Sequence, residues 1–279
     1  LVTLSEYRLQ RLILSVSNLT LPLMMVVRRS NNKLKSPLKG RRMTVKEAER
    51  VAETVGEDRN DVKRKIFYSH KEELWNAWSH SGGIVLGIVF GTIFLVWCFQ
   101  ERSGWATVGV ILYLVGMLFS YVSSTVYHAL SARSVWKERL RKWDHAAIYW
   151  HIAGSYSPIT LTVLRNQGAW GWGLFSFVWL CAILGTISSL RKLRDHSNLE
   201  TLTFIGMGLS VLVAFKPLAD SLPISSIIWI VAEGVMYITG ALFYSLNKRR
   251  YMHTVFHFFV LLGSICHIIA VWEILMEYL

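Results

Sequence analysis

Three histidines, one aspartate and one serine stand at spacings that could support metal chemistry. His253 and His257 are four residues apart, so on a helix they share one face about one turn apart. Ser124 and His128 repeat this spacing in a second segment, and Asp144 lies in a third. Three imidazoles bind zinc tetrahedrally and leave one position open, which is the arrangement of catalytic zinc sites. The residue types therefore point to a zinc site at His128, His253 and His257.

The same residues suggest how such a site could work. Thr254 occupies the place of the glutamate in a His-Glu-x-x-His motif, so a general base must come from elsewhere. Asp144 is the candidate base, and it would take a proton from a water whose pKa zinc lowers towards ~7. Ser124, one turn from His128, could orient a ligand or donate a hydrogen bond to an oxyanion that develops on the substrate.

A simpler interpretation of each residue stays open. A histidine pair at this spacing can serve helix packing or an interface. Asp144 could pair with Arg141, and Ser124 could be a small residue at a helix contact. Three separate segments nevertheless bring ionisable groups to one predicted membrane depth. Such groups within membrane helices are functional candidates by default.

The elements that must position these residues are apolar runs. The chain is 53% hydrophobic and 17% charged, against roughly 25% charged in soluble domains. After residue 75 the runs are long enough to cross a membrane, and they lack the alternation of barrel strands. We expect an all-α integral membrane protein, a seven-transmembrane helix bundle. The predicted spans are residues 78–99, 105–127, 145–164, 170–190, 199–215, 224–246 and 255–275.

The charges predict the orientation of the bundle. The net charge is +12, and half of the 30 Lys and Arg residues lie in residues 1–70. The second, fourth and sixth loops carry Arg133, Lys137, Arg139, Arg141 and Lys142, then Arg191, Lys192 and Arg194, then Lys248, Arg249 and Arg250. The other three loops carry only Arg102, Arg165 and Lys216. Because basic loops stay inside, we expect a cytosolic N-terminus, an outer C-terminus and a metal site at the cytosolic face.

This charge pattern is topological and does not indicate a nucleic-acid partner. The basic loops could bind anionic lipid headgroups. Cys98, Cys181 and Cys266 fall in apolar runs, so we expect small buried residues rather than disulfides or thiolate ligands.

Three parts are expected along the chain. Residues 1–42 are a basic N-terminal extension that could be a signal segment, an interfacial helix or sequence upstream of a start at Met43, and we favour the last. Residues 43–74 are charged and predict a cytosolic helical segment. Residues 75–279 form the transmembrane domain.

The motifs around these residues resemble those of the hemolysin III family, bacterial relatives of the progestin and adiponectin receptors. The resemblance covers about residues 70–275. The matching motifs are Asn76-Ala-Trp-Ser-His80, Ser124-Thr-Val-Tyr-His128, Trp143-Asp144-His145-Ala-Ala-Ile-Tyr149, Ile152-Ala-Gly-Ser-Tyr156-Ser-Pro158 and His253-Thr-Val-Phe-His257 with Gly263, Ser264 and His267.

The resemblance implies seven transmembrane helices with the N-terminus inside, in a bacterial plasma (inner) membrane. It implies Zn²⁺ bound by His128, His253 and His257, with Asp144 and Ser124 beside it. The wider superfamily includes alkaline ceramidases, which favours a zinc-dependent hydrolase acting on an amide or ester bond of a membrane lipid, such as a ceramide-like substrate. A receptor or sensor with structural zinc, and a pore-forming or cytolytic channel, are the alternatives.

Some residues depart from the family pattern. His151 stands where an aliphatic residue is usual, Glu233 replaces glycine in the sixth span, and Ser157 replaces threonine. Glu233 and His151 could line a hydrated cavity, but a polar pair at a helix contact is the favoured interpretation. His267 is ten residues past His257, about 15 Å along the helix axis, so it is not a ligand of the same metal. A channel would need these residues and His80 to form a continuous polar stripe.

Overall fold

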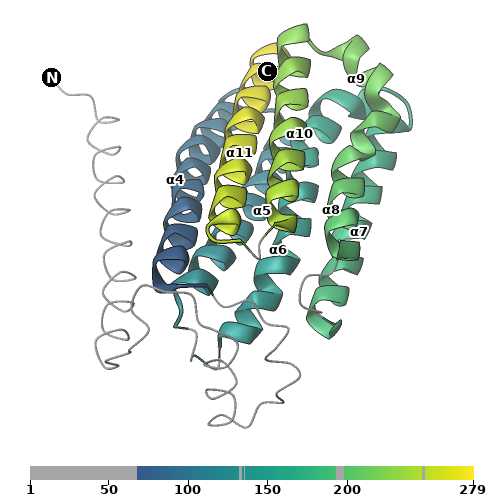
Figure 1. Ribbon diagram of the computed structural model, residues 1–279. Coiled ribbons are helices and arrows are strands. Elements are labelled where there is room, and N and C mark those ends of the chain that lie inside the picture. The colour runs from purple at the N-terminus through teal and green to yellow at the C-terminus, as the bar shows by residue number, and fades with distance from the viewer. Residues whose placement is uncertain (1–67, 132–133, 135, 193–197, 247–248) are drawn as a thin grey trace, which may run out of the picture.

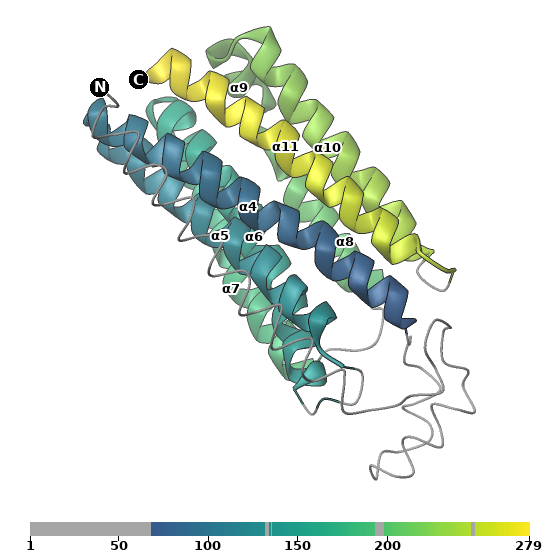
Figure 2. The ribbon, with the colours of Figure 1, turned by 90° about the vertical axis from the view of Figure 1, so that its left-hand side faces the viewer.

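The computed structural model describes residues 68–131, 134, 136–192, 198–246 and 249–279. Within these ranges the chain is helical and contains no strand. The helices pack side by side as a bundle (Figure 1), and α11 lies between α4 and α10 (Figure 2). The predictions for residues 1–42, and for most of 43–74, lie outside the described residues.

The first helix, α4, covers His70–Gln100 and begins before the predicted residue 78. A capping box fixes this start. The Glu72 amide donates to Ser69 Oγ at 3.3 Å, and the Ser69 amide donates to Glu72 Oε2 at 2.9 Å. The next helix, α5, covers Gly104–Ala129. The early start of α4 adds two polar turns below the apolar run, at the end of the bundle where α5 finishes (Figure 1).

The third helix, α6, covers Lys137–Pro158 and continues as a π-helical turn over Ile159–Val163 and a 3₁₀ turn over Leu164–Asn166. Pro158 has no N–H to donate, and the widened turn follows it directly. Helix α7 covers Trp170–Lys192. The segment made of α6 and its two following turns, residues 137–166, thus extends at both ends beyond the predicted span at residues 145–164.

The fifth predicted span, residues 199–215, does not end at Lys216 and Pro217 as expected. It consists of α8 over Asn198–Leu209, a 3₁₀ segment over Ser210–Ala214 and α9 over Phe215–Ser221. Pro217 lies in the first turn of α9, where no intrahelical N–H bond is needed, so it is compatible with a new helix. The prediction of its end was therefore wrong.

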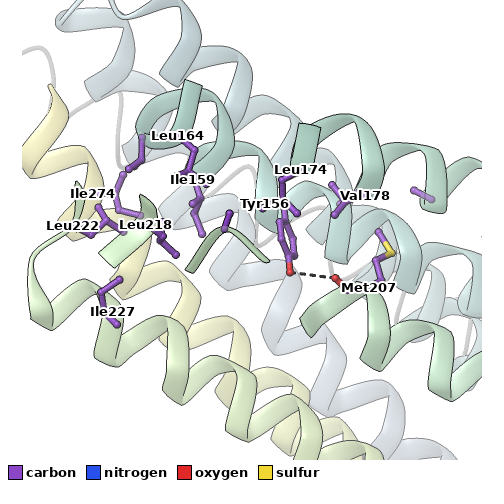
Figure 3. Packing of buried hydrophobic residues seen from close by; sticks show 14 of the residues in the cluster. Tyr156, Ile159, Leu164, Leu174, Val178, Met207, Leu218, Leu222, Ile227 and Ile274 are labelled. Atoms are coloured by element: carbon purple, nitrogen blue, oxygen red, sulfur yellow. Dashed lines mark hydrogen bonds between the residues drawn. The ribbon is translucent and has the colours of Figure 1, made fainter. Parts of the chain in front are cut away.

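The break in this span is held by a tyrosine from α6. The Tyr156 hydroxyl accepts a hydrogen bond from the Val211 amide at 3.0 Å and donates to the Gly208 carbonyl. It also lies 3.2 Å from the Met207 carbonyl (Figure 3). The tyrosine belongs to a buried apolar cluster that also includes Leu174, Val178 and Leu218. It therefore ties backbone groups left open by the 3₁₀ segment to the core of the bundle.

Helices α10 (Ile224–Ser245) and α11 (Met252–Tyr278) complete the described chain. Six helical segments of the described chain are long and apolar enough to span a membrane, namely 70–100, 104–129, 170–191, 200–221, 224–245 and 252–278. Their length and composition indicate an integral multi-pass membrane protein. Helix α6 corresponds to the third predicted span but is too polar to meet this criterion, because its first turns are rich in charge.

Close approach of α5 and α6 depends on small residues. Gly116 of α5 and Gly154 of α6 face each other, and a Cβ built on either would lie 3.3 Å from the other's Cα. A Cβ on Gly154 would also lie 2.9 Å from the Leu112 carbonyl oxygen. The two backbones are therefore in direct contact, as is common between membrane helices. Cys98, Cys181 and Cys266 are free cysteines, and Cys98 and Cys266 are buried as predicted, whereas Cys181 is partly exposed.

Candidate metal centre

Three histidines from two helices converge at one end of the bundle. His128 lies in the last turn of α5, and His253 and His257 lie in the first turns of α11. His253 Nε2 is 3.3 Å from His128 Nε2 and 3.0 Å from His257 Nε2. One ligand atom from each of the three lies within 4.8 Å of the others. The structure thus brings together the three side chains that the sequence indicated.

A carboxylate from α4 orients His128. Glu73 Oε2 is 2.6 Å from His128 Nδ1, and Lys137 Nζ bonds the other oxygen of Glu73 at 2.8 Å. A carboxylate can only accept, so Nδ1 carries the proton and donates it. In the neutral ring the Nε2 atom of His128 then carries the lone pair, which points towards His253.

The main chain of α4 orients His257 in the same way. His257 Nδ1 is 3.1 Å from the Asn76 carbonyl oxygen and 3.3 Å from Ser79 Oγ. Because a carbonyl oxygen only accepts, Nδ1 is again the protonated nitrogen. Ser79 Oγ donates to the same carbonyl at 2.9 Å, which leaves its lone pairs available to the histidine. The Nε2 lone pair of His257 therefore also points towards His253.

These tautomers fit a cation at the centre. His253 Nε2 can give one proton to only one of its two neighbours, so at least one inward nitrogen lone pair receives no proton from the other two rings. A positive ion placed among the three satisfies the inward lone pairs. Zinc–nitrogen bonds of about 2.0–2.1 Å in tetrahedral geometry place ligand nitrogens about 3.3 Å apart. The two separations, 3.0 and 3.3 Å, agree with this value.

Asp144 and Ser124 lie next to the three histidines without joining them. Asp144, on α6, is half-buried and lies near His128. The Ser124 hydroxyl, one turn before His128 on α5, lies beside the Asp144 carboxylate. The chain therefore places a carboxylate and a hydroxyl together on one side of the cluster, as the sequence suggested.

Comparison with known proteins places this architecture in a family. A profile described as "Haemolysin-III related" matches residues 67–268, which include all five of these side chains. The chain belongs to the haemolysin III family.

Curated members of the family match most of the bundle. The chain is 36% identical over 194 residues to Hemolysin-3 of Bacillus cereus, covering 70% of this chain and 87% of that protein. It is 32% identical over 197 residues to the Hemolysin-3 homolog of Bacillus subtilis, covering 71% and 91%. The monocyte to macrophage differentiation factor of Homo sapiens is 25% identical over 186 residues, covering 64% and 72%.

Sequence reasoning missed the contribution of α4 to the haemolysin III centre. Glu73, Asn76 and Ser79 lie three residues apart, so they share a helix face, and all three contact a histidine of the cluster. That spacing is visible in the sequence, but similar spacings occur on any helix. Trp75 and Trp78 point out from the same turns and are more than half exposed, which places this level at the membrane interface.

The remaining singled-out residues of this haemolysin III chain lie elsewhere. His145 pairs with Glu200 of α8 at 3.0 Å and so points away from the cluster, as expected. His80 stacks on His257 with ring centroids 3.6 Å apart. Glu233 and His267 pair with each other at 2.8 Å, and His151 Nε2 is 3.5 Å from Ser264 Oγ. Polar pairing at helix contacts was the favoured interpretation, and these contacts agree with it.

Proposed function

We propose that this haemolysin III protein is a zinc-dependent membrane hydrolase that cleaves an amide or ester bond of a lipid. The supporting observation is the orientation of His128 and His257, whose Nδ1 protons are held by Glu73 and the Asn76 carbonyl so that both Nε2 lone pairs face inward. Such outer hydrogen bonds accompany almost all metal-ligating histidines. The convergence of these Nε2 atoms on His253 Nε2, at 3.3 and 3.0 Å, is the feature that favours a metal over packing alone.

In the membrane topology that we propose, α6 is a seventh crossing, the membrane is a bacterial inner membrane and the N-terminus lies in the cytosol. Helix α6 packs against α5 and α7 along its length, so its polar residues are shielded by neighbours. The basic residues of its first turns, including Arg139 and Arg141, then lie at the cytosolic surface. The histidine cluster lies at the same end of the bundle (Figure 1).

The chemistry follows from the groups around the cluster. A zinc ion held by the three histidines would supply Lewis acidity that polarises a carbonyl group and acidifies water. As a water molecule attacks the carbonyl carbon, Asp144 takes its proton and passes it to the departing nitrogen or oxygen. Ser124 donates a hydrogen bond to the carbonyl oxygen as it becomes negative. The products are a carboxylic acid and an amine or alcohol.

A lipid is the substrate class that the location favours. The cluster lies at the level of Trp75 and Trp78, which face outward from α4. Headgroup linkages of lipids lie at this interfacial depth, whereas their chains extend into the hydrocarbon. A ceramide, with one amide bond at that depth, fits this position and is the first substrate to test.

A structural zinc in a receptor or sensor is the second candidate. The cluster joins α5 to α11, and its hydrogen bonds bring in α4, so a bound ion would cross-link three helices. This role needs the histidines and Glu73 but has no use for Asp144. The two candidates therefore differ in what Asp144 contributes.

The experiment compares metal content and turnover in the purified full chain. Wild type, His253→Ala and Asp144→Asn are assayed for zinc and for release of fatty acid from ceramides and ester lipids. Asp220→Asn, an exposed aspartate paired with Lys216, is the matched control. We expect His253→Ala to lose zinc, and Asp144→Asn to keep it while turnover falls by about 10²–10⁴-fold.

Each outcome separates the candidates. Equal zinc in wild type and His253→Ala overturns the metal site itself. If zinc-loaded wild type cleaves none of these lipids, the hydrolase proposal is overturned and the structural role remains. The structural role also predicts that Asp144→Asn leaves zinc content unchanged.

A further inference from the structure

A second ionisable pair lies deeper in the bundle. His267 of α11 and Glu233 of α10 are joined by a 2.8 Å contact between Nδ1 and Oε2. The His267 side chain is 2% exposed and that of Glu233 is 12% exposed. The ten residues from His257 to His267 correspond to about 15 Å of helix, or half the hydrocarbon thickness. This pair is therefore separate from the metal centre.

Two polar atoms beside this pair have no hydrogen-bond partner among the described residues. They are His267 Nε2 and the hydroxyl oxygen of Tyr113, both buried. Tyr113, on α5, packs against His267 with ring centroids 4.8 Å apart. Buried polar groups nearly always have a partner, so two open groups side by side require an explanation.

The surroundings of the pair are rich in groups that hold or pass protons. Ser264 Oγ is 2.7 Å from the Tyr121 hydroxyl and 3.2 Å from the Tyr237 hydroxyl. The titratable groups facing the pair are Tyr113 and Tyr121 of α5, His151 and Tyr156 of α6, Tyr237 of α10 and Cys266 of α11, while His80 of α4 lies next to Tyr121. Acidic and basic side chains are costly at this depth, and membrane proteins retain them chiefly for function.

We propose that Glu233 and His267 form a proton-binding site inside the membrane, distinct from the histidine cluster. Its ligand is a proton that reaches the pair through Glu233, the more accessible partner. This inference does not rest on the hydrolase activity, because none of its residues takes part in that chemistry.

The open nitrogen of His267 is the acceptor for the added proton. In the resting state His267 Nδ1–H donates to the Glu233 carboxylate at 2.8 Å, and the Nε2 lone pair has no partner among the described residues. When the pair takes up a proton, it binds at Nε2, and the Glu233 carboxylate next to Nδ1 stabilises the imidazolium.

The test measures protonation of His267 directly, in the full chain reconstituted in lipid nanodiscs. The imidazole ¹⁵N resonances of His267 are identified as those missing from His267→Gln, and they are followed from pH 4 to pH 9. We expect a single titration within this range. Glu233→Gln preserves shape and one hydrogen bond but removes the negative charge, so the midpoint should fall by at least one pH unit, a tenfold loss of proton affinity.

A matched control and a contrary result complete the test. Glu273 lies on α11, the helix of His267, and its carboxylate accepts a hydrogen bond from Ser226 at 2.9 Å. Glu273→Gln should leave the His267 midpoint unchanged. A His267 signal that stays constant from pH 4 to pH 9 in wild type overturns the proposal, and so does an identical midpoint in Glu233→Gln. The wild-type titration decides the question even if a variant fails to fold.

Discussion

Glu73 accepts a hydrogen bond from the Nδ1 atom of His128 at 2.6 Å, although 55 residues separate the two in the chain. The contact joins the first turn of α4 to the last turn of α5. It sets which nitrogen of His128 faces the cluster, so a residue that cannot reach the ion itself decides whether His128 is available as a ligand.

Glu73→Gln is expected to weaken zinc binding. The amide no longer offers a charged acceptor to His128 Nδ1, so we expect about 10–100-fold lower affinity, measured by competition with a chromogenic chelator. Glu101→Gln, an exposed glutamate just past the other end of α4, should bind as wild type does. Unchanged affinity in Glu73→Gln would show that this carboxylate does not orient the ligand.

Ser79→Ala should have a much smaller effect on the same measurement. His257 Nδ1 keeps the Asn76 carbonyl as an acceptor at 3.1 Å when the serine hydroxyl is lost. We therefore expect a change in zinc affinity of no more than about threefold. A loss as large as that in Glu73→Gln would mean that the hydroxyl, rather than the main chain, holds the tautomer.

Removal of metal should lower the thermal stability of the wild-type chain in detergent. An ion bound by His128, His253 and His257 stabilises the folded state by mass action and links α5 to α11. We expect the Tm to fall on addition of a strong chelator and to recover with excess zinc. His253→Ala should begin at a lower Tm and show no further decrease, and a chelator effect of equal size in that variant would contradict metal binding here.

Gly116→Ala tests the close contact of α5 and α6. The added methyl group would collide with the Trp150 carbonyl and approach the Gly154 Cα to 3.3 Å, and backbone atoms cannot turn aside. We expect a loss of about 1–3 kcal/mol in stability, seen as a lower Tm. Gly173→Ala is the control, because its methyl group would meet nothing within 4 Å, and its Tm should not decrease.

Tyr156→Phe tests the break in the fifth predicted span. The variant leaves the Val211 amide and the Gly208 carbonyl without the Tyr156 hydroxyl. The Met207 carbonyl, in contrast, keeps Ser210 Oγ at 2.7 Å. We expect a loss of about 1–3 kcal/mol and faster hydrogen exchange around residues 207–211. Tyr278→Phe is the control, because it removes an exposed hydroxyl contact that water can replace. Hydrogen exchange around residues 207–211 should match wild type in this variant. Unchanged exchange in Tyr156→Phe would mean that the 3₁₀ segment is self-sustaining.

The sequence by itself determined the helical membrane architecture and the three histidines. Apolar runs longer than a bilayer is thick can satisfy their backbone only as helices, so six predicted spans have counterparts in the structure. The four-residue spacing of His253 and His257 already implied a shared face. These features depend on residues close together in the chain, so a single sequence is enough to predict them.

Only the tertiary structure decided what surrounds those histidines and where one span breaks. Glu73 belongs to the centre because α4 packs beside α5, and the 3₁₀ segment after α8 persists beside a hydroxyl from α6. His267 meets Glu233 only because α10 and α11 lie in contact. These contacts depend on the packing of helices distant in sequence. That packing is a sum over many small interactions, which no single motif encodes.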